Sequence, residues 1–417
     1  MRIATAHSFD TTINHLAKRQ ADLSSLQESL ATGKRVRKAS DDPVAATLAE
    51  TASNRLSRAQ SDLRALESSR ASLQQAESGL AESGELIQRV RELMVSAGNG
   101  TFGPSEREDI ARQLEGLRDQ LLNVANRQDN SGRTLFGGLG GSTTPFVDVY
   151  GPTGVQFNGQ RGQAAAGAAA LPQALDGDAI WMRIPQGNGS FRLDLDAGNT
   201  GGLRTDLGEV TNLSQLTGHR YGISFSDASG TMRYSITDLD DATRNPLDGQ
   251  VDVAYEAGKA IQFDGMSMRL LGQPNAGDSV AVNPVSGPTD LFKVVQDAID
   301  ALRGKVVVPD DVALNATGPG RGAQLTQQMA RAMAELDAGH DRVLLARARA
   351  GEWLNRADSL DNMLNNRATG HEVERSRLED LDLVRGISDF QSQQVGLEAA
   401  LKSYAQVQRL SLFQFVA

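Results

Sequence analysis

Few residues of this chain could carry out chemistry, and their spacing completes no catalytic or metal site. His371 and Glu372 begin an H-E-x-x-H pattern, but Arg375 stands where a second histidine must hold the zinc ion. The chain has no cysteine, which excludes disulfides, thiolate metal sites and cysteine nucleophiles. It also lacks the Gly-x-Ser-x-Gly turn of the serine hydrolases. We therefore expect no enzyme activity, no metal and no cofactor.

Glycine-rich segments offer no better candidate for a nucleotide site. Residues 318–323 fit G-x-G-x-x-A, but no tight strand precedes them and Pro319 lacks a donor N–H, so we interpret them as a joint before a helix. The Gly-Lys pairs lack the rest of a phosphate-binding loop. Paired acids, such as Asp194 with Asp196, lie in strand or turn contexts, and we expect them to be solvated.

Composition narrows the class of protein further. The 417 residues carry a net charge of −10 and have a pI near 5.1, which argues against general nucleic-acid binding. No apolar run approaches the roughly 18–20 residues of a membrane span, so we expect no membrane insertion. The N-terminus lacks the apolar stretch and cleavage site of a secretory signal. The protein is then either cytoplasmic or exported by a route that reads no such signal.

Both ends of the chain carry apolar residues at heptad spacing. Each seam alternates steps of four and three residues with glutamine interruptions, which is typical of a coiled-coil helix. The first apolar set is Phe9, Ile13, Leu16, Leu23 and Leu30, and the last is Leu383, Ile387, Phe390, Leu397, Leu401 and Tyr404. An isolated helix with a narrow apolar stripe is marginal in water, so the two seams are predicted to bury each other.

The extreme C-terminus remains apolar beyond this seam. Its apolar residues include Leu410, Leu412, Phe413 and Phe415, and no polar cap follows them. Pairing of the two seams would leave these side chains exposed in a monomer, and an exposed apolar patch usually marks a partner surface. We therefore expect both termini to be assembly elements.

Long helices are predicted between each terminus and the middle of the chain. Asp41, Asp42 and Pro43 form a helix start, because Asp42 can cap free N–H groups and proline suits the first turn. Residues 105–108 form a capping box for another helix that should close at Ser131 and Gly132. A short helix is expected at 290–302, and a long helix from about Gly322 that should end near Gly370.

The middle of the chain, roughly 138–290, alternates apolar and polar residues between glycine-rich turns. The segments 221–225 and 232–236 are predicted to form a hairpin, and further short strands favour a sandwich or an open barrel. Trp181 and Trp353 are expected to be packing residues. The predicted fold class is therefore α+β, with a long antiparallel helical bundle or coiled coil built from both termini and a central inserted β-rich domain.

Several ordered motifs resemble the flagellin superfamily of bacterial flagella. They are LSSLQESLATGK at 23–34, Ser40 to Ala45 with its Asp41-Asp42-Pro43 core, Gly132 to Gly138 with Arg133, Phe136 and Gly137, and the tail VQRLSLFQFVA. Within the superfamily the chain resembles the hook–filament junction family, the hook-associated proteins 3, more than the flagellins, whose tails tend to end in Leu-Leu-Arg. The resemblance covers about 1–138 and 289–417.

The resemblance implies a role, partners and a division of the chain. Members leave the cell as unfolded chains through the flagellar type III channel, after a cytoplasmic export chaperone has held the C-terminal helix. By this resemblance, the segments 1–40 and 371–417 form an inner core, 41–138 with 289–370 a helical rod, and 139–288 an outward-facing β-rich domain. The implied partners are hook-associated protein 1, flagellin and further copies of the chain in a ring-like layer, and the implied location is the extracellular hook–filament junction.

Other functions are compatible with the same pattern. A flagellin-like filament subunit would share the terminal helices but polymerise without limit, whereas an adaptor should stop at one layer. The insertion could instead serve as a surface binding or adhesin module. An enzyme hidden in the insertion has no motif to support it.

Overall fold

The computed structural model describes residues 2–98, 102–140, 143–149, 154–163, 165–166, 171–228, 230–307, 313–315 and 321–416. Within these ranges the side chains at 2–9, 165–166, 305–307, 313–315, 321 and 407–416 lie outside the description. The chain divides into two compact units, one formed by Met1–Ala65 with Ser359–Ala417 and the other by Leu66–Asp358. Two long helices, α2 and α6, contribute residues to both units.

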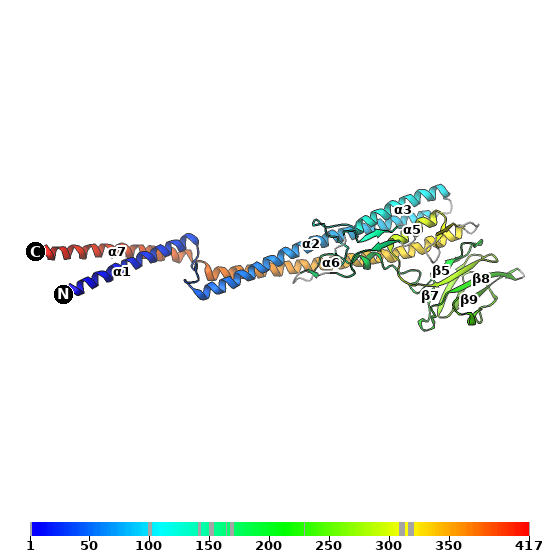
Figure 1. Cartoon of the computed structure of the whole chain (residues 1–417). Helices are drawn as coiled ribbons and strands as arrows, with labels where there is room; N and C mark the ends of the chain where they lie inside the picture. The colour runs from blue at the N-terminus through cyan, green and yellow to red at the C-terminus, as the bar shows by residue number, and fades with distance from the viewer. Residues whose placement is uncertain are drawn as a thin grey trace. The chain divides into compact units, whose positions relative to one another are not determined.

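Helices dominate both ends of the chain. They are α1 (Arg2–Thr32), α2 (Pro43–Ala97), α3 (Pro104–Ala125), the short α4 (Gly177–Trp181), α5 (Leu291–Leu302), α6 (Arg321–Glu379) and α7 (Leu383–Val416), with 3-10 turns η1 (Leu213–Gln215) and η2 (Ala242–Arg244). Figure 1 shows α1 and α2 in blue and α6 and α7 in orange and red. The predicted helix starts at Pro43 and after Asp290 are confirmed, because Asp42 and Asp290 each accept a backbone N–H three residues on.

Within the 66–358 unit, α2 and α6 run antiparallel and share a core. Their heptad residues are buried, as the spacing predicted: Leu66, Leu73, Leu80, Ile87 and Met94 on α2 and Met329, Leu336, Val343, Ala350 and Ala357 on α6. Surface ion pairs join Arg70 to Asp358, Arg91 to Asp337 and Arg347 to Glu77. Helices α3 and α5 pack on each other and add their apolar faces to the same core.

Several residues between 146 and 184 also belong to this first core, namely Phe146, Val155, Leu175, Ile180, Trp181 and Ile184. This part of the chain contains β1 (Phe146–Asp148), β2 (Val155–Phe157), β3 (Ala165–Ala166), β4 (Leu171–Pro172) and α4. Trp181 is fully buried and meets Phe136 and Phe146 edge-on, with ring centroids 4.6 and 5.4 Å away. Trp353 packs half-buried against the same cluster. Both tryptophans are therefore packing residues.

A second core belongs to a β module formed by residues 191–284. One sheet has the strand order β10-β9-β8-β13-β5 and the other β11-β12-β6, with β7 also pairing β12. Their bounds are β5 (Phe191–Leu195), β6 (Arg204–Thr205), β7 (Glu209–Val210), β8 (Tyr221–Ala228), β9 (Thr231–Asp238), β10 (Val253–Ala254), β11 (Ala260–Phe263), β12 (Met266–Leu271) and β13 (Ser279–Pro284). The antiparallel register of β8 and β9 confirms the predicted hairpin. The sheets are open, and the predicted α+β fold class is confirmed.

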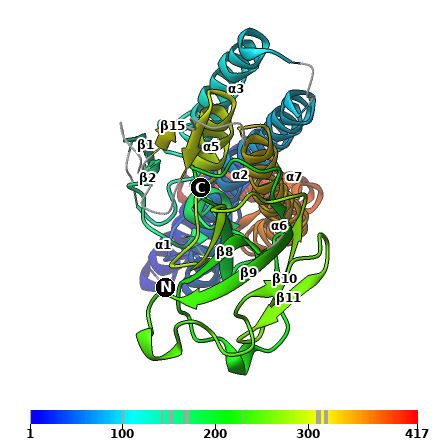
Figure 2. The ribbon, with the colours of Figure 1, turned by 90° about the vertical axis from the view of Figure 1, so that its right-hand side faces the viewer.

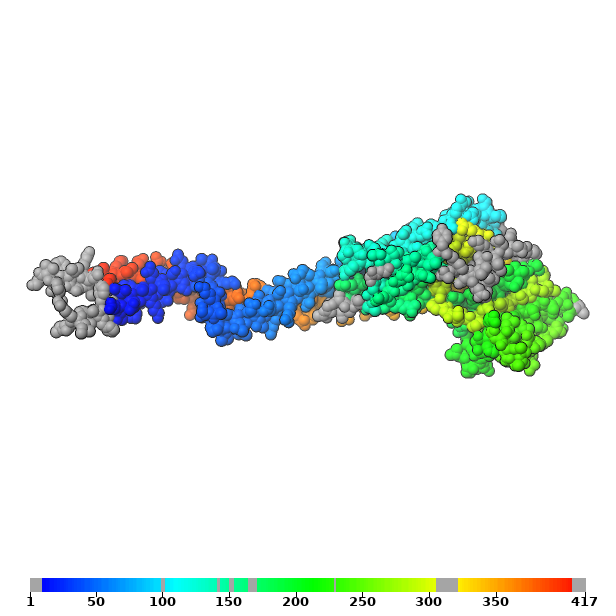
Figure 3. All heavy atoms as spheres, in the orientation of Figure 1, coloured from blue at the N-terminus to red at the C-terminus, as the bar shows by residue number. Residues whose placement is uncertain are grey.

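A narrow neck connects the β module to the helical part of its unit. Ile184 and Thr289 exchange two backbone hydrogen bonds of 2.9 and 2.8 Å. Figures 1 and 2 show the strands of the module gathered beside α6. The space-filling view shows the same residues as a lobe next to the helices (Figure 3). A further short hairpin, β14 (Lys305–Val307) with β15 (Ala313–Asn315), follows α5.

Three predicted helix boundaries and one side-chain environment were wrong. Helix α3 begins at Pro104, and its N-cap Gly103 provides no side-chain bond, so Ser105 lies inside the helix rather than capping it. Its end at Ala125 comes before Ser131, because the Asn126 side chain bonds both the N–H and the C=O of Phe146. Helix α6 continues through Gly370 to Glu379. Asp194 is buried instead of solvated.

Candidate functional site

Helices α1 and α7 pack side by side in the unit that contains both termini (Figure 1). The predicted seam residues fall into two groups. Leu16, Leu23, Leu30, Phe390, Leu397 and Tyr404 are half-buried. Ile13, Leu383, Ile387 and Leu401 remain 43, 52, 49 and 49% exposed. The pair therefore buries only part of the apolar surface that its two seams present.

The remaining predicted members lie outside the described side chains. They are Phe9 in α1 and the tail residues Leu410, Leu412, Phe413 and Phe415 in α7. Only their position within the two helices is described. Their roles as interface and partner-binding residues stay predictions.

Exposed apolar side chains on α7 extend beyond the predicted seam. Val384 is 82% exposed and Val395 66%, and both lie among the exposed seam residues of the same helix. Single exposed apolar residues are normal, but several along one helix mark a surface that needs a partner. The heptad pattern missed these two valines because they lie outside its a and d positions.

Two glycines of α7 allow it to approach α1 closely. A Cβ at Gly386 would lie 2.9 Å from the Leu381 side chain and 3.1 Å from the Leu30 side chain. A Cβ at Gly396 would lie 2.9 Å from a guanidinium nitrogen of Arg19. Small residues at a helix contact shorten the distance between backbones. Neither glycine was singled out from the sequence. A glycine inside a helix costs about 1 kcal/mol relative to alanine, so its presence in an apolar heptad helix indicates a close packing contact.

The segments that follow α1 and precede α7 are joined by backbone hydrogen bonds. Arg35 N–H donates to the Glu379 carbonyl at 2.7 Å, and Leu381 N–H donates to the Gly33 carbonyl at 2.9 Å. Gly33 ends α1 with a φ of +69°, as the sequence predicted. Lys34 adds an ion pair with Glu379 at 2.8 Å. The helix pair is thus closed at the end where α1 stops and α7 starts.

The Asp41-Asp42-Pro43 motif organises the start of α2. Asp41 accepts the backbone N–H groups of Arg37 and Lys38, which lowers the pKa of its carboxyl group. Asp42 accepts Ala45 N–H at 3.0 Å, and this bond lowers the pKa of Asp42 in the same way. Pro43 is the first residue of the helix. Each carboxylate therefore shapes the turn that precedes the helix, which requires no external ligand.

The second motif, residues 132–138, is built around Asp129. The Asp129 carboxylate accepts bonds from Ser131 and from both the backbone and the guanidinium of Arg133, and these bonds overcome the effect of burial and lower its pKa. Arg133 also donates to Gln173 at 2.8 Å. Arg133, Phe136 and the glycines of this motif were named from the sequence, but the Asp129 carboxylate, which lies just before the motif, was missed.

Phe136 and the glycines after it fix this motif to the first core. The Phe136 side chain is fully buried. A Cβ at Gly137 would lie 2.3 Å from the Thr134 hydroxyl oxygen, and one at Gly138 would lie 1.8 Å from the Gln160 carbonyl oxygen. Gly138 also has a φ of +71°. The motif is therefore a packing device that joins the segment after α3 to the first core and to Gln160.

Chemistry of another kind finds no support among these side chains. Within the described residues, no group of three His, Cys, Asp or Glu could hold a metal ion. His371 lies 3.5 Å from Glu374, one turn along α6. Residues 318–320 of the G-x-G-x-x-A segment lie outside the described residues. The large apolar side chains described as exposed include no aromatic ring of the kind that stacks on sugars. No described helix has the length and apolar character needed to span a membrane.

Known proteins resemble this chain in sequence along nearly its whole length, and in structure along about three quarters of it. Residues 3–140 match the family described as the bacterial flagellin N-terminal helical region. Flagellar hook-associated protein 3 of Escherichia coli K12 is 27% identical over 99% of both chains, and that of Salmonella typhimurium is 26% identical over 99% of both. The flagellar junction protein FlgL from Legionella pneumophila superposes with a TM-score of 0.63 at 26% identity, covering 74% of this chain and 98% of that one.

The chain resembles flagellar hook-associated protein 3 over its whole length. The resemblance predicted from the two ends is confirmed, and it includes the middle segment that carries no recognisable motif. The relatives named above are proteins of the flagellum, and their descriptions name no enzyme. The chain is accordingly similar, over nearly its whole length, to components of the bacterial flagellum.

Proposed function

We propose that this chain is a structural adaptor that joins the flagellar hook, through hook-associated protein 1, to the flagellin filament. The observation that carries the proposal is the apolar surface left exposed on the paired terminal helices. Leu383, Ile387 and Leu401 are about half exposed when α1 and α7 have only each other as partners. Burying such a stripe requires more helices of the same kind, as in an axial assembly. Similarity to hook-associated protein 3 along 99% of the chain favours the junction over other axial positions.

The proposed assembly is heterologous and head-to-tail, so that the same patches repeat around a helical axis. In it the terminal segments 1–40 and 371–417 form the inner core, and 41–138 with 289–370 form the rod. Residues 139–288 face outward from the junction. The tail with Leu410, Leu412, Phe413 and Phe415 first meets a cytoplasmic chaperone, and the chain then leaves through the type III channel to reach the extracellular junction.

The decisive experiment is deletion of the gene, followed by electron microscopy of the cells and assay of flagellin in the medium. An adaptor predicts bare hooks with flagellin monomers lost to the medium. Complementation with Phe390→Ala combined with Leu397→Ala should fail to restore filaments, because both are half-buried seam residues of α7, the helix that packs on α1. The matched control, Gln391→Ala with Glu398→Ala, changes exposed neighbours on α7 and should restore them.

Filaments still attached to hooks in the deletion strain would refute the adaptor. A filament subunit is distinguished by the purified chain, which would then polymerise into long filaments without a limit on length. An adaptor of one layer gives short rings or no polymer under the same conditions.

A further inference from the structure

The contact between the β module and α6 is polar, although each side has its own apolar core. The first core gathers residues from the helices and from 146–184, and the second gathers residues from 191–284. Between them, one row of α6 side chains faces the module at heptad-like spacing. The row consists of Gln324, Gln327, Arg331 and Glu335. It replaces the apolar stripe by which two packed elements usually join.

Each member of the row bonds a different segment of the module or its neck. Gln324 donates to the carbonyls of Asp196 and Ala197 at 3.0 and 3.1 Å. Gln327 accepts Thr205 N–H at 2.9 Å and donates to the Thr205 hydroxyl at 2.6 Å. Glu335 accepts Gly187 N–H at 3.3 Å. These bonds fix the module on α6 through polar groups, and the apolar residues of the two cores form separate clusters.

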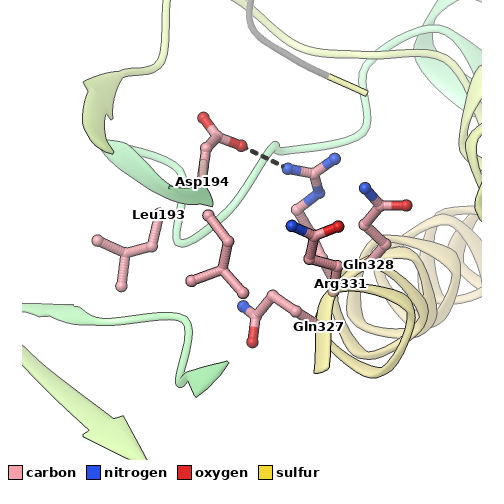
Figure 4. A pocket seen from close by; sticks show the side chains of 7 residues that line it. Leu193, Asp194, Gln327, Gln328 and Arg331 are labelled. Carbon is pink, nitrogen blue, oxygen red and sulfur yellow. Dashed lines mark hydrogen bonds and ion pairs between the residues drawn. The ribbon is translucent and has the colours of Figure 1, made fainter. Parts of the chain in front are cut away.

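An ion pair lies at the centre of the row. The guanidinium of Arg331 is 2.7 Å from Asp194 of β5, and these side chains keep only 12 and 7% of their area exposed. Figure 4 shows Arg331 reaching from α6 toward Asp194, with Gln327 and Gln328 beside it. Asp194 also bonds Arg192 at 3.0 Å and Asn283 at 2.8 Å. A cavity of about 20 Å³, room for about one water molecule, lies between residues 193–195 of β5 and the α6 residues Gln324, Gln327, Gln328 and Arg331. The two faces therefore do not interlock fully.

Two further buried carboxyl groups, Asp297 of α5 and Glu335 of α6, interact electrostatically with Arg331. Burial raises the pKa of Glu335 and of Asp297. Arg331 partly offsets the effect at Glu335, and Lys293 with Arg331 partly offsets it at Asp297. Although burial opposes it, the carboxylates of Asp194, Glu335 and Asp297 raise the pKa of Arg331. Removing several charges from water costs free energy that their attraction does not always return, so a buried ion pair contributes less stability than an apolar contact of the same size.

We propose that this polar row is a separable joint, at which the β module leaves α6 as a folded body before either core unfolds. The neck through Ile184 and Thr289 keeps the module attached when the joint opens. Opening exposes the Asp194 carboxylate and the Arg331 guanidinium to water. Hydration of these two charged groups offsets much of the attraction that is lost when they separate. Opening of an apolar contact has no such compensation.

Two backbone amides report directly on the joint. The N–H groups of Thr205 and Gly187 donate to Gln327 and Glu335, and both acceptors lie across the joint. Native-state hydrogen exchange of the full chain, read by mass spectrometry with fragmentation, should find both amides exchanging at least tenfold faster than the β8–β9 ladder and the interior of α5. Their exchange should also accelerate with low urea, because a module that leaves α6 exposes new surface.

Two results would overturn the proposal. Protection of Thr205 and Gly187 equal to that of the β8–β9 ladder would mean that the module separates only in global unfolding. Exchange at both amides that ignores urea would mean local fraying without any movement of the module.

A charge-removing variant tests the cause. Arg331→Met keeps an unbranched side chain about as long as the aliphatic stem of arginine and removes the guanidinium. It should accelerate exchange at Thr205 and Gly187 at least tenfold while the β8–β9 ladder keeps its protection. Arg347→Met is the matched control on the same helix, because Arg347 pairs with Glu77 at the surface, away from the joint. Equal exchange in the two variants would show that the Arg331 pair does not hold the joint.

Discussion

Replacement of Phe136 by alanine should lower the free energy of unfolding of the 66–358 unit by about 3–5 kcal/mol, the usual range for a buried phenylalanine. The upper half of that range is expected because the site has little freedom to collapse. The Phe136 ring is fully buried and its centroid is 4.6 Å from that of Trp181. The ring also lies close to Gly79 of α2, since a Cβ built there would be 3.5 Å from Phe136 Cζ and 3.5 Å from the Val124 side chain of α3. Against a typical total of about 5–15 kcal/mol, this loss is large.

Urea unfolding followed by tryptophan fluorescence measures the effect, since Trp181 touches the altered ring. The matched control is Leu139→Ala, a deletion three residues away at a side chain that is 52% exposed, and it should cost under about 1 kcal/mol. A loss below about 1 kcal/mol for Phe136→Ala would refute the reasoning, because it would mean that the 132–138 motif does not depend on this buried contact.

Four other changes test separate parts of the structure. Gly138→Ala should destabilise the same unit by at least about 2 kcal/mol in urea unfolding, since a Cβ there would lie 1.8 Å from the Gln160 carbonyl oxygen at a φ of +71°; unchanged stability would contradict the contact. Gly386→Leu should separate α1 from α7, seen as faster amide exchange in α1, whereas Gly351→Leu, where nothing lies near the added atom, should not. Asp42→Ala should speed exchange of the Ala45 amide and leave the middle of α2 unaffected, and equal rates would argue against the cap. Burial raises the pKa of Asp290 to about 6. The contribution of this group to the stability of the fold is therefore complete below its ordinary pKa near 4 and is lost as pH rises through 6. The free energy of unfolding should fall by about 1–3 kcal/mol from pH 4 to pH 7.5, and Asp290→Asn should reduce this pH dependence.

Local periodicity explains which elements the sequence could predict. The heptads of α2 and α6 repeat large apolar residues every seven positions, and nothing except a buried helix face produces that pattern. The hairpin of β8 and β9 is equally local, since its alternation and its turn lie in one short segment. The helix starts at Pro43 and Leu291 follow from the side chains immediately before them.

The remaining features depend on contacts between distant segments. Arg331 and Glu335 appear in the sequence as an ordinary charged helix face, and only the fold places Asp194 beside them. The predicted capping box at Ser105 is wrong because α3 already begins at Pro104, with Gly103 as its N-cap. Proline suits the first helical position since it has no N–H group to satisfy, so Ser105 lies inside the helix. Gly386 and Gly396 become informative only when α1 lies against α7.

The candidate interface also has one part that local periodicity predicts and one part that it does not. Its heptad positions were readable, and the structure describes six of them as half-buried and four as exposed. Val384 and Val395 lie between heptad positions, so a search limited to those positions overlooks them. Which of these side chains meets a neighbour depends on chains beyond this one, and their assembly role stays a prediction.

The surface ion pairs between α2 and α6 also select one alignment of two repetitive helices. Apolar heptads look alike after a slip of seven residues, so the core of this pair tolerates several alignments. The three ion pairs form in only one of these alignments. A slip of one heptad in either direction brings Arg70 opposite Gly351 or Asn365, Glu77 opposite His340 or Leu354, and Arg91 opposite Ala330 or Leu344. Each exposed ion pair adds at most about 1 kcal/mol, but a slip of one heptad removes all three together. The ion pairs therefore favour one register of α2 against α6 each time the chain folds.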